Sequence, residues 1–434
     1  MMGVLLLVFA VALAGQAVDP AALSQQAGRA MAAGQFEAAA GLYRQLVGQL
    51  PKVGGLRMNL GLALFQAGKH REAAGELAAA LRLEPGLAPA AMMLGLCHAK
   101  LGEPLAAIPL LERALRAEAG NAVVQLELAD AYYAVGRYAS AVEGFRRLTA
   151  LRPADPVAWR GLGLSLTGHS QELFGKLAPT SAEALTLLAR ARMAADEPKA
   201  AYRLLRQALE RDPAFGPAHG YMAELTGKAS SQAGPGTGAF LAVVAASDEA
   251  LAAYGRLAAL PPSVALYETE AEAAQARGAH VEAVAAWRKA LRLAPGKAGL
   301  ERGLARALFA ARNFEEALPV LRKHGLSYEL GAALLETGKA AEAVGHLVNL
   351  RTPAGQAALG RAYLALDQPT KAIGPLRAAL ATDTDGSVHF QLARALQRTG
   401  AAEQAREMDR VSQQIRQARA DEQAALDAVV IGTP

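Results

Sequence analysis

The stretch Ala122–Pro153 reads AVVQLELADAYYAVGRYASAVEGFRRLTALRP and carries the pattern that decides the fold. Its first half places apolar or small residues at helical spacing, at Leu128, Ala129 and Tyr132. Gly136 follows, in the manner of the left-handed residue that ends many helices. The second half again has helical spacing, at Tyr138, Ala141, Phe145 and Leu148. Pro153 cannot continue that helix, so the stretch predicts two antiparallel helices joined by a tight turn.

The landmarks of this stretch recur every 34 residues. Glycines keep that spacing at Gly34, Gly68, Gly102 and Gly136, and an alanine follows each by five residues, at Ala39, Ala73, Ala107 and Ala141. Small residues share the period at Ala27, Gly61, Gly95, Ala129 and Gly163. Prolines do so at Pro51, Pro85 and Pro153. Several series in one register indicate an internal repeat in which small residues let two helices approach closely.

These residues resemble the tetratricopeptide repeat (TPR). Trp159–Gly163 is similar to the W-x-x-L-G signature of that family, and its tyrosine, alanine, aromatic and proline places are filled by Tyr132, Ala141, Phe145 and Pro153. The resemblance spans roughly residues 20–410. It implies an all-α fold, a right-handed α-solenoid of helix-turn-helix units.

The 34-residue spacing becomes irregular after about residue 163. The unit at 156–181 keeps only a short second helix near 171–177, and Pro217–Thr226 is predicted to be a first helix without a partner. We expect an isolated helix at Ser247–Leu260, and shortened units at 298–323 and 324–352 that have lost residues from either their loops or their helix ends. Five further units are marked by alanines, at Ala283, Ala317, Ala343, Ala372 and Ala405.

These features divide the chain into five parts. Residues 1–17 are predicted to be a signal peptide, and residues 18–226 a first TPR array. The Gly/Ser-rich stretch 227–238 is interpreted as a flexible linker, with an ordered loop as the alternative. A second array covers 239–412, and a polar helix and tail at 413–434 cap its open end.

The N-terminal segment predicts where in the cell the protein is located. Val4–Leu13 is an apolar run that spans only about 15 Å as a helix, half of a bilayer core. Small residues at Gly15 and Ala17 fit a signal-peptide cleavage site, and Ala12 and Ala14 form a competing one, although no Lys or Arg precedes the run. We therefore expect export to the bacterial periplasm or cell envelope. An uncleaved membrane anchor and a buried N-terminal helix are the alternatives.

No motif for chemistry accompanies the repeats. The chain has no H-E-x-x-H, P-loop, G-x-S-x-G or C-x-x-C sequence, and its single cysteine, Cys97, reads as a small buried apolar residue. The net charge of +5 comes without a basic stripe, which argues against nucleic-acid binding. We expect no catalytic residues, no metal and no cofactor, and therefore no enzyme.

Resemblance to TPR proteins implies that one face of each first helix lines a concave, peptide-binding groove. In the early units this face is apolar, at Met31, Met58, Leu62, Phe65, Met92, Leu96 and Tyr133. Methionine adapts its shape to different partners, and a long apolar stripe in water is uncommon unless it binds something. The alternative is that adjacent first helices bury these residues against each other.

The corresponding face of the later units is basic, at Arg302, Arg306, Arg361, Arg394 and Arg398. Arginine favours bidentate contacts to carboxylates, although a merely solvated face is the alternative. The Lys/Asn/Arg carboxylate clamp of some TPR proteins is absent, since Met58 and Leu62 occupy its places.

The sequence thus predicts an exported TPR scaffold that binds a protein or peptide segment in its concave groove. The alternative is a structural component of envelope assembly, acting by self-association or by membrane attachment through an uncleaved segment 4–13.

Overall fold

The computed structural model describes residues 19–429, and the regular elements in that part of the chain are all helical. The predicted all-α repeat solenoid is confirmed. The chain forms two compact units, unit 1 and unit 2, that divide between Gly168 and His169. The predicted signal peptide, residues 1–17, lies outside the described residues.

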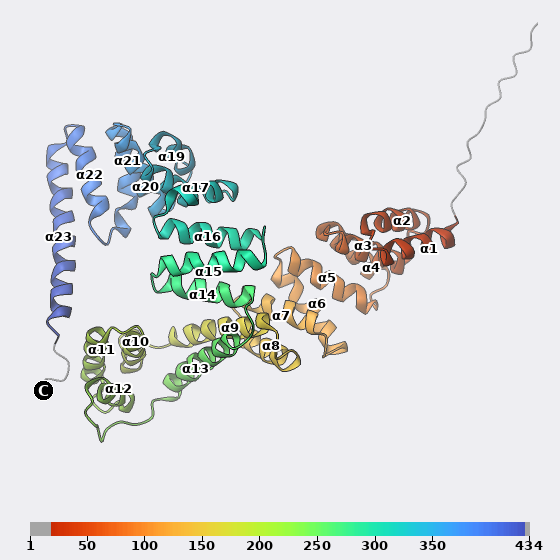
Figure 1. Ribbon diagram of the computed structural model, residues 1–434, viewed down its shortest axis with the longest axis horizontal. Coiled ribbons are helices and arrows are strands. Elements are labelled where there is room, and N and C mark those ends of the chain that lie inside the picture. The colour runs from red at the N-terminus through yellow and green to blue at the C-terminus, as the bar shows by residue number, and fades with distance from the viewer. Residues whose placement is uncertain (1–18, 430–434) are drawn as a thin grey trace, which may run out of the picture. The chain divides into compact units, whose positions relative to one another are not determined.

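Unit 1 consists of helical hairpins placed one after another (Figure 1). Its helices are α1 (Pro20–Ala32), α2 (Phe36–Gln49), α3 (Gly54–Gln66), α4 (His70–Leu83), α5 (Ala88–Lys100), α6 (Pro104–Ala117), α7 (Ala122–Ala134), α8 (Tyr138–Leu151) and the first part of α9 (Pro156–Phe174). The odd-numbered members are the first helices of the repeats and the even-numbered ones the second helices.

The turn inside each hairpin of unit 1 depends on its glycine. Gly34, Gly68, Gly102 and Gly136 adopt left-handed φ angles of 72°, 76°, 72° and 74°. The next residue then donates its backbone N–H to the carbonyl five residues back, over 2.9 Å in all four turns. This is the hydrogen bond of a Schellman motif, and it ends the first helix.

Small residues set the spacing between the paired helices. Ala39, Ala73, Ala107 and Ala141 are all fully buried. At Gly61, a Cβ atom would lie 2.6 Å from Cγ of Leu77, closer than carbon atoms approach. The repeating alanines and glycines of the sequence are therefore the contact points at which the helices meet.

Unit 2 continues the helical hairpins with more variation. Its helices are α10 (Ala182–Ala194), α11 (Pro198–Arg211), α12 (Gly216–Thr226), α13 (Gly238–Ala258), α14 (Val264–Ala276), α15 (His280–Leu293), α16 (Ala298–Ala310), α17 (Phe314–Lys323), α18 (Ser327–Glu336), α19 (Ala340–Leu347), α20 (Pro353–Ala365), α21 (Pro369–Ala379), the 3-10 turn η1 (Leu380–Thr382), α22 (Ser387–Arg398) and α23 (Ala402–Asp427).

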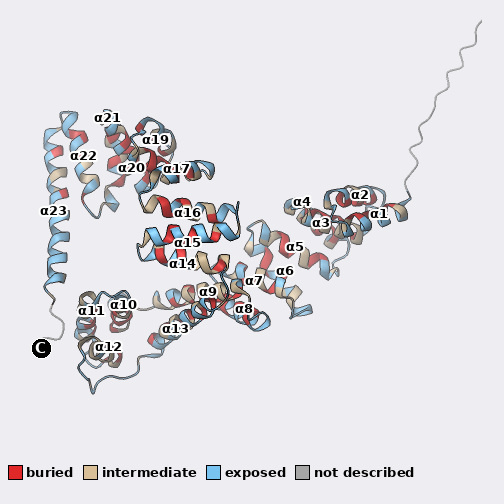
Figure 2. Cartoon of the chain, viewed as in Figure 1, coloured by how far each residue is buried: buried red, intermediate tan, exposed pale blue. Residues whose placement is uncertain are grey.

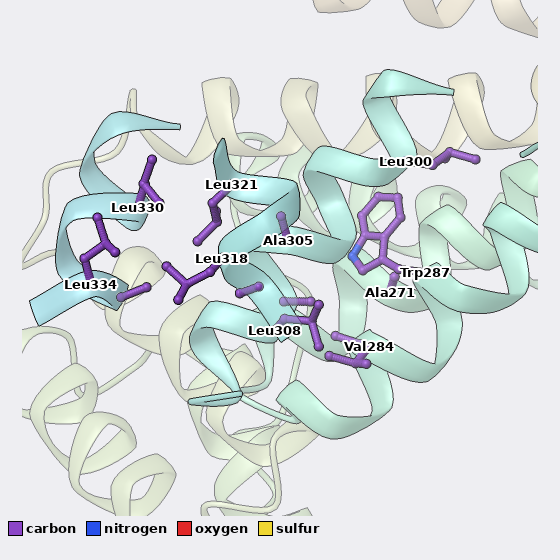
Figure 3. Close-up of a cluster of buried hydrophobic side chains, with 14 of the residues drawn as sticks. Ala271, Val284, Trp287, Leu300, Ala305, Leu308, Leu318, Leu321, Leu330 and Leu334 are labelled. Atoms are coloured by element: carbon purple, nitrogen blue, oxygen red, sulfur yellow. The ribbon is translucent and has the colours of Figure 1, made fainter. Parts of the chain in front are cut away.

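One hydrophobic core of unit 2 runs through α14 to α20, and separate clusters lie among α10 to α13 and among α20 to α23. Figure 3 shows aliphatic side chains and Trp287 filling the space between helices α14 to α18 of the first of these cores. Helices α17, α18 and α19 have only 10, 10 and 8 residues, so the shortened repeats are as predicted. Four of the marker alanines are fully buried and the fifth is nearly so, at Ala283, Ala317, Ala343, Ala372 and Ala405.

Three turns of unit 2 lack the glycine. Asp196, Arg312 and Asp367 take φ angles of 58°, 60° and 55° at the places that glycine holds in unit 1. A left-handed residue with a Cβ costs roughly 1–2 kcal/mol. The close packing of the helix pairs therefore imposes the turn even on residues that disfavour it.

The short second helix expected near 171–177 does not form. Instead α9 is a single helix from Pro156 to Phe174. The place of the turn glycine, 34 residues after Gly136, is held by Ser170, so nothing ends the helix there. The Ser170 hydroxyl is buried and lies 2.7 Å from the hydroxyl of Ser247 on α13.

The helix expected at Ser247–Leu260 is longer and is not isolated. α13 begins at Gly238 because Thr237 caps it, accepting a hydrogen bond from the backbone of Phe240. The Phe240 ring packs edge-on against Phe215, with centroids 5.5 Å apart. The predicted helix start at Ser247 was therefore nine residues too late.

The remaining predicted boundaries stay predictions. Backbone atoms of Gly234, within the predicted linker, lie so close to Gly216 that a Cβ there would be 2.7 Å away. The last helix, α23, packs through Ala405 and Ser412, and Figure 2 shows it exposed over most of its length. A helix with so little buried surface fits the predicted polar end of the array.

Candidate functional site

The predicted apolar site lies on the first helices α1, α3 and α5 of unit 1. We call six of its residues the apolar row: Met31, Met58, Leu62, Phe65, Met92 and Leu96. Leu96 is buried, at 7% exposure, and the other five are half-buried. The helices therefore cover part of each side chain, and apolar surface remains in contact with water.

Two packed clusters share the apolar row. Met31 and Met58 pack against the core of α1 to α5, whereas Met92 packs beside Leu96 in the next cluster. Phe65 belongs to both. Packing between neighbouring first helices, the alternative to a binding role, thus accounts for one side of these residues, and a binding role for the other side stays a prediction.

Tyr133, the seventh predicted residue, lies farther along the same face on α7. It is 38% exposed, and its ring meets Tyr138 edge-on with centroids 5.7 Å apart. Charged residues accompany it at this end of the face. Lys100 of α5 forms an ion pair with Glu127 of α7, which links two neighbouring repeats.

Asp130 is the unusual charge on this face. Burial among neighbouring helices and the nearby Glu127 carboxylate together raise its pKa to about 6, against the opposing effect of Lys100 and Arg160. Its side chain is nevertheless exposed. A carboxylate crowded by protein but open to water suits a surface that a ligand covers.

The predicted arginines of unit 2 are all exposed, but most of them already have partners. Arg306 pairs with Glu329 at 3.2 Å, and Arg361 with Glu336 at 2.6 Å. Arg398 lies 3.3 Å from Asp367. Sequence reasoning missed these acids because the shortened repeats shift their register relative to the arginines.

Two of the arginines differ from the others. Within residues 19–429, Arg302 and Arg394 form no hydrogen bond or ion pair. They lie on α16 and α22, so the structure does not bring them together with each other. The five arginines are therefore a row of separate sites, three of them occupied by acids of the same chain.

A hollow outside the predicted site lies between α6, α7 and α8. It measures about 550 Å³, and Gln125, Tyr132 and Gly144 are among its lining residues. The Tyr132 hydroxyl donates to Glu112 over 2.5 Å, and burial with this carboxylate raises the pKa of Tyr132 to about 12. One feature of the sequence indicates this hollow. Gly144, which has no side chain, stands where the earlier repeats have Leu42, Glu76 and Leu110.

The described residues show little that resembles a site for chemistry. Residues 19–429 contain no group of His, Cys, Asp or Glu side chains able to hold a metal ion. Cys97 is fully buried, and burial raises the pKa of its thiol to about 12, which makes it unreactive. None of the helices described is both long and apolar enough to span a membrane.

Comparison with protein families decides the identity of the repeats. The family described as Tetratricopeptide repeat matches residues 25–88, 59–122 and 98–163. Residues 25–163 of the chain are tetratricopeptide repeats. The matched residues are those of α1 to α9, where the 34-residue period is regular.

Solved structures of other TPR proteins are similar to parts of this chain. MamA is 19% identical over 45% of this chain and 92% of its own, with a TM-score of 0.33. MamA AMB-1 is 23% identical over 35% of this chain and 82% of its own, also with a TM-score of 0.33. YrrB, described as a TPR protein with an unusual peptide-binding site, is 17% identical over 46% of this chain and 90% of its own, with a TM-score of 0.32. No curated protein matches the chain.

TPR proteins are in general non-catalytic scaffolds, and the TPR fold supports a role in protein interaction for this chain.

Proposed function

We propose that this TPR protein is an exported scaffold that binds an apolar segment of a partner protein along the apolar row of unit 1. The observation that carries the proposal is the repetition of half-buried side chains on three successive first helices. Each retains apolar surface that the protein's own packing leaves in water. Covering such surface contributes about 25 cal/mol per Å².

The side chains of the apolar row favour a partner that is not rigidly defined in shape. Met31, Met58 and Met92 are unbranched and flexible, and methionine can repack around different aliphatic or aromatic groups. Leu62 and Phe65 lie between them in the sequence and offer more rigid contacts. The row therefore suits an apolar peptide segment better than a single small molecule.

The arginines of unit 2 supply a second surface in this proposal. Arg302 and Arg394 have no acidic partner within the described residues, so either could bind a carboxylate of the partner without breaking an existing pair. Arg306, Arg361 and Arg398 would first have to release theirs. We expect this surface to contribute less affinity than the apolar row.

Binding can be tested with a library of twelve-residue synthetic peptides selected on the immobilised full chain. Met58→Lys with Met92→Lys should abolish enrichment of apolar peptides. Phe65 is left in place because both core clusters depend on it. The helical circular dichroism signal should be unchanged, since a lysine stem can lie along an apolar surface with its charge in water.

The matched control changes two exposed aliphatic residues of second helices to lysine. Leu105 and Val281 are 71% and 78% exposed, so Leu105→Lys with Val281→Lys adds the same charge away from the apolar row. The control should enrich the same peptides as the unchanged chain. Equal enrichment by the methionine variant, or no enriched peptide at all, would contradict binding at the apolar row.

Export rests on the apolar run at residues 4–13 and has its own test. Fractionation of the native cell, followed by mass spectrometry of the tagged protein, should give an envelope location and a mature N-terminus near Gly15 or Val18. An intact N-terminus in the membrane fraction would instead favour the anchored assembly component.

A further inference from the structure

One charged residue interrupts an otherwise apolar line along unit 1. The 34-residue period places Asp130 on α7 where earlier first helices have Leu62 and Leu96 and the following one has Leu164. The three leucines are half-buried or buried, whereas Asp130 is exposed. A carboxylate thus stands in line with aliphatic side chains on neighbouring helices.

The surroundings of this carboxylate leave its charge uncompensated. Within residues 19–429, Asp130 forms no hydrogen bond and no ion pair. The nearest cation on α5, Lys100, is already paired with Glu127. Glu127 itself lies one turn away on α7 and adds a second negative charge. The pKa of about 6 expresses the same imbalance, because Glu127 and burial outweigh Lys100 and Arg160.

A bound cation would correct this imbalance. An ammonium or guanidinium group at Asp130 would supply the missing donor and offset the repulsion from Glu127. An anion or a purely apolar group would leave the carboxylate crowded and unpaired, which is costly once water is excluded. This face of the first helices therefore favours a ligand that has a positive charge at α7 and apolar groups at α1, α3 and α5.

We propose that Asp130 is the cation subsite of the apolar row, so that the partner segment carries a basic group next to its apolar residues. The proposal rests on the proposed function, because it names the chemistry of the segment that unit 1 binds. The cation is a lysine or arginine side chain, or the amino terminus of the segment; these share one chemistry.

The fold also sets the spacing within the segment. Neighbouring packed helices lie about 10 Å apart, and an extended peptide advances about 3.3 Å per residue. Leu96 and Asp130 occupy the same place on the neighbouring first helices α5 and α7. The basic residue should therefore lie roughly three positions from the aliphatic residue that contacts Leu96.

The test uses the twelve-residue peptide library on the full chain, in one form with free and one with acetylated N-termini. We expect enriched peptides that combine aliphatic residues with a Lys or Arg about three positions away. Asp130→Asn should weaken these peptides about tenfold and remove the preference for basic residues. Enrichment confined to free N-termini would place the terminal amine at Asp130.

Glu143→Gln is the matched control. Glu143 is an exposed carboxylate of α8, on a second helix, and its removal changes the net charge equally. This variant should bind within twofold of the unchanged chain. Enriched peptides that are apolar without basic residues, or equally basic on Asp130→Asn, would overturn the cation subsite and leave the proposed function standing. No enrichment on the unchanged chain would overturn both.

Discussion

Units 1 and 2 build the same helical hairpin from different residues. In unit 1 a glycine holds each left-handed turn inside a hairpin, whereas unit 2 has glycine at some of these turns, such as Gly278 and Gly338, and Asp196, Arg312 or Asp367 at three others. The first-helix face differs as well, being apolar and half-buried in unit 1 but arginine-rich and exposed in unit 2. The buried alanines are common to both units. Helix contacts therefore fix the fold, and the turn and the face are free to diverge.

This comparison implies that the two faces contribute differently to stability. Phe65 packs in two clusters at once, so Phe65→Ala should lower the free energy of unfolding by about 2 kcal/mol. A shift in the urea midpoint of the full chain would measure the loss. Hydrogen exchange should locate it in α3 and α5, because repeat proteins unfold locally.

Phe390→Ala provides the control for losing an aromatic ring on a first helix of unit 2. Phe390 is 36% exposed and contacts Arg416 through its ring face at 5.2 Å. Its loss should cost less than half as much. Equal losses in the free energy of unfolding would mean that the apolar face of unit 1 contributes no more to stability than the corresponding face of unit 2.

The turns provide the next contrast. Gly136→Ala should destabilise the protein by about 1 kcal/mol, because alanine disfavours the left-handed turn. Arg312→Gly should act in the opposite direction, by less than about 1 kcal/mol, since it relieves strain but frees the unfolded chain. Its ion pair with Glu336, at 3.5 Å and exposed, adds little. Thermal unfolding of both variants tests the signs, and two losses would refute the contrast.

The sequence was sufficient for the hairpins and insufficient for their exceptions. Glycine at a fixed interval predicts a turn because few other residues adopt a left-handed φ, so α1 to α8 follow from spacing alone. Ser170 removes that signal, and its contact with Ser247 of α13, 77 residues away, is not readable from the repeat spacing. The sequence pattern identified the arginines but not their partners Glu329 and Glu336. Which acid lies beside which arginine depends on how the shortened repeats pack, and the sequence spacing does not show that.

Electrostatics should distinguish the units by the sign of a pH effect. Burial and the Glu127 carboxylate raise the pKa of Asp130 to about 6 against Lys100 and Arg160, so its charged form destabilises the folded state, fully above pH 6 and progressively less below it. Asp130→Asn should therefore raise Tm at pH 7.5. The difference should shrink as pH falls through 6 and vanish near pH 4.

Glu301 in unit 2 should behave in the opposite way. Hydrogen bonds from Lys323 and His324, at 2.6 and 2.7 Å, lower the pKa of its carboxyl group. The stability it contributes is present above the unfolded pKa of about 4.3 and is lost at lower pH. Glu301→Gln should thus lower Tm at pH 7.5, with the difference closing below about pH 4. Shifts of the same sign in both variants would contradict the assignment.

The smallest effect should come from the arginine face itself. Arg361 is exposed, and within residues 19–429 it bonds only to Glu336, a carboxylate that also lies 3.5 Å from Arg312. Arg361→Leu should change the free energy of unfolding by less than about 0.5 kcal/mol, because surface ion pairs contribute little and Arg312 can still serve Glu336. Urea unfolding beside Phe65→Ala gives the comparison directly. A loss above about 1.5 kcal/mol would make the arginine row a structural element like the apolar row. Its side chains would then be holding α18 to α20, and only Arg302 and Arg394 would remain available to a partner.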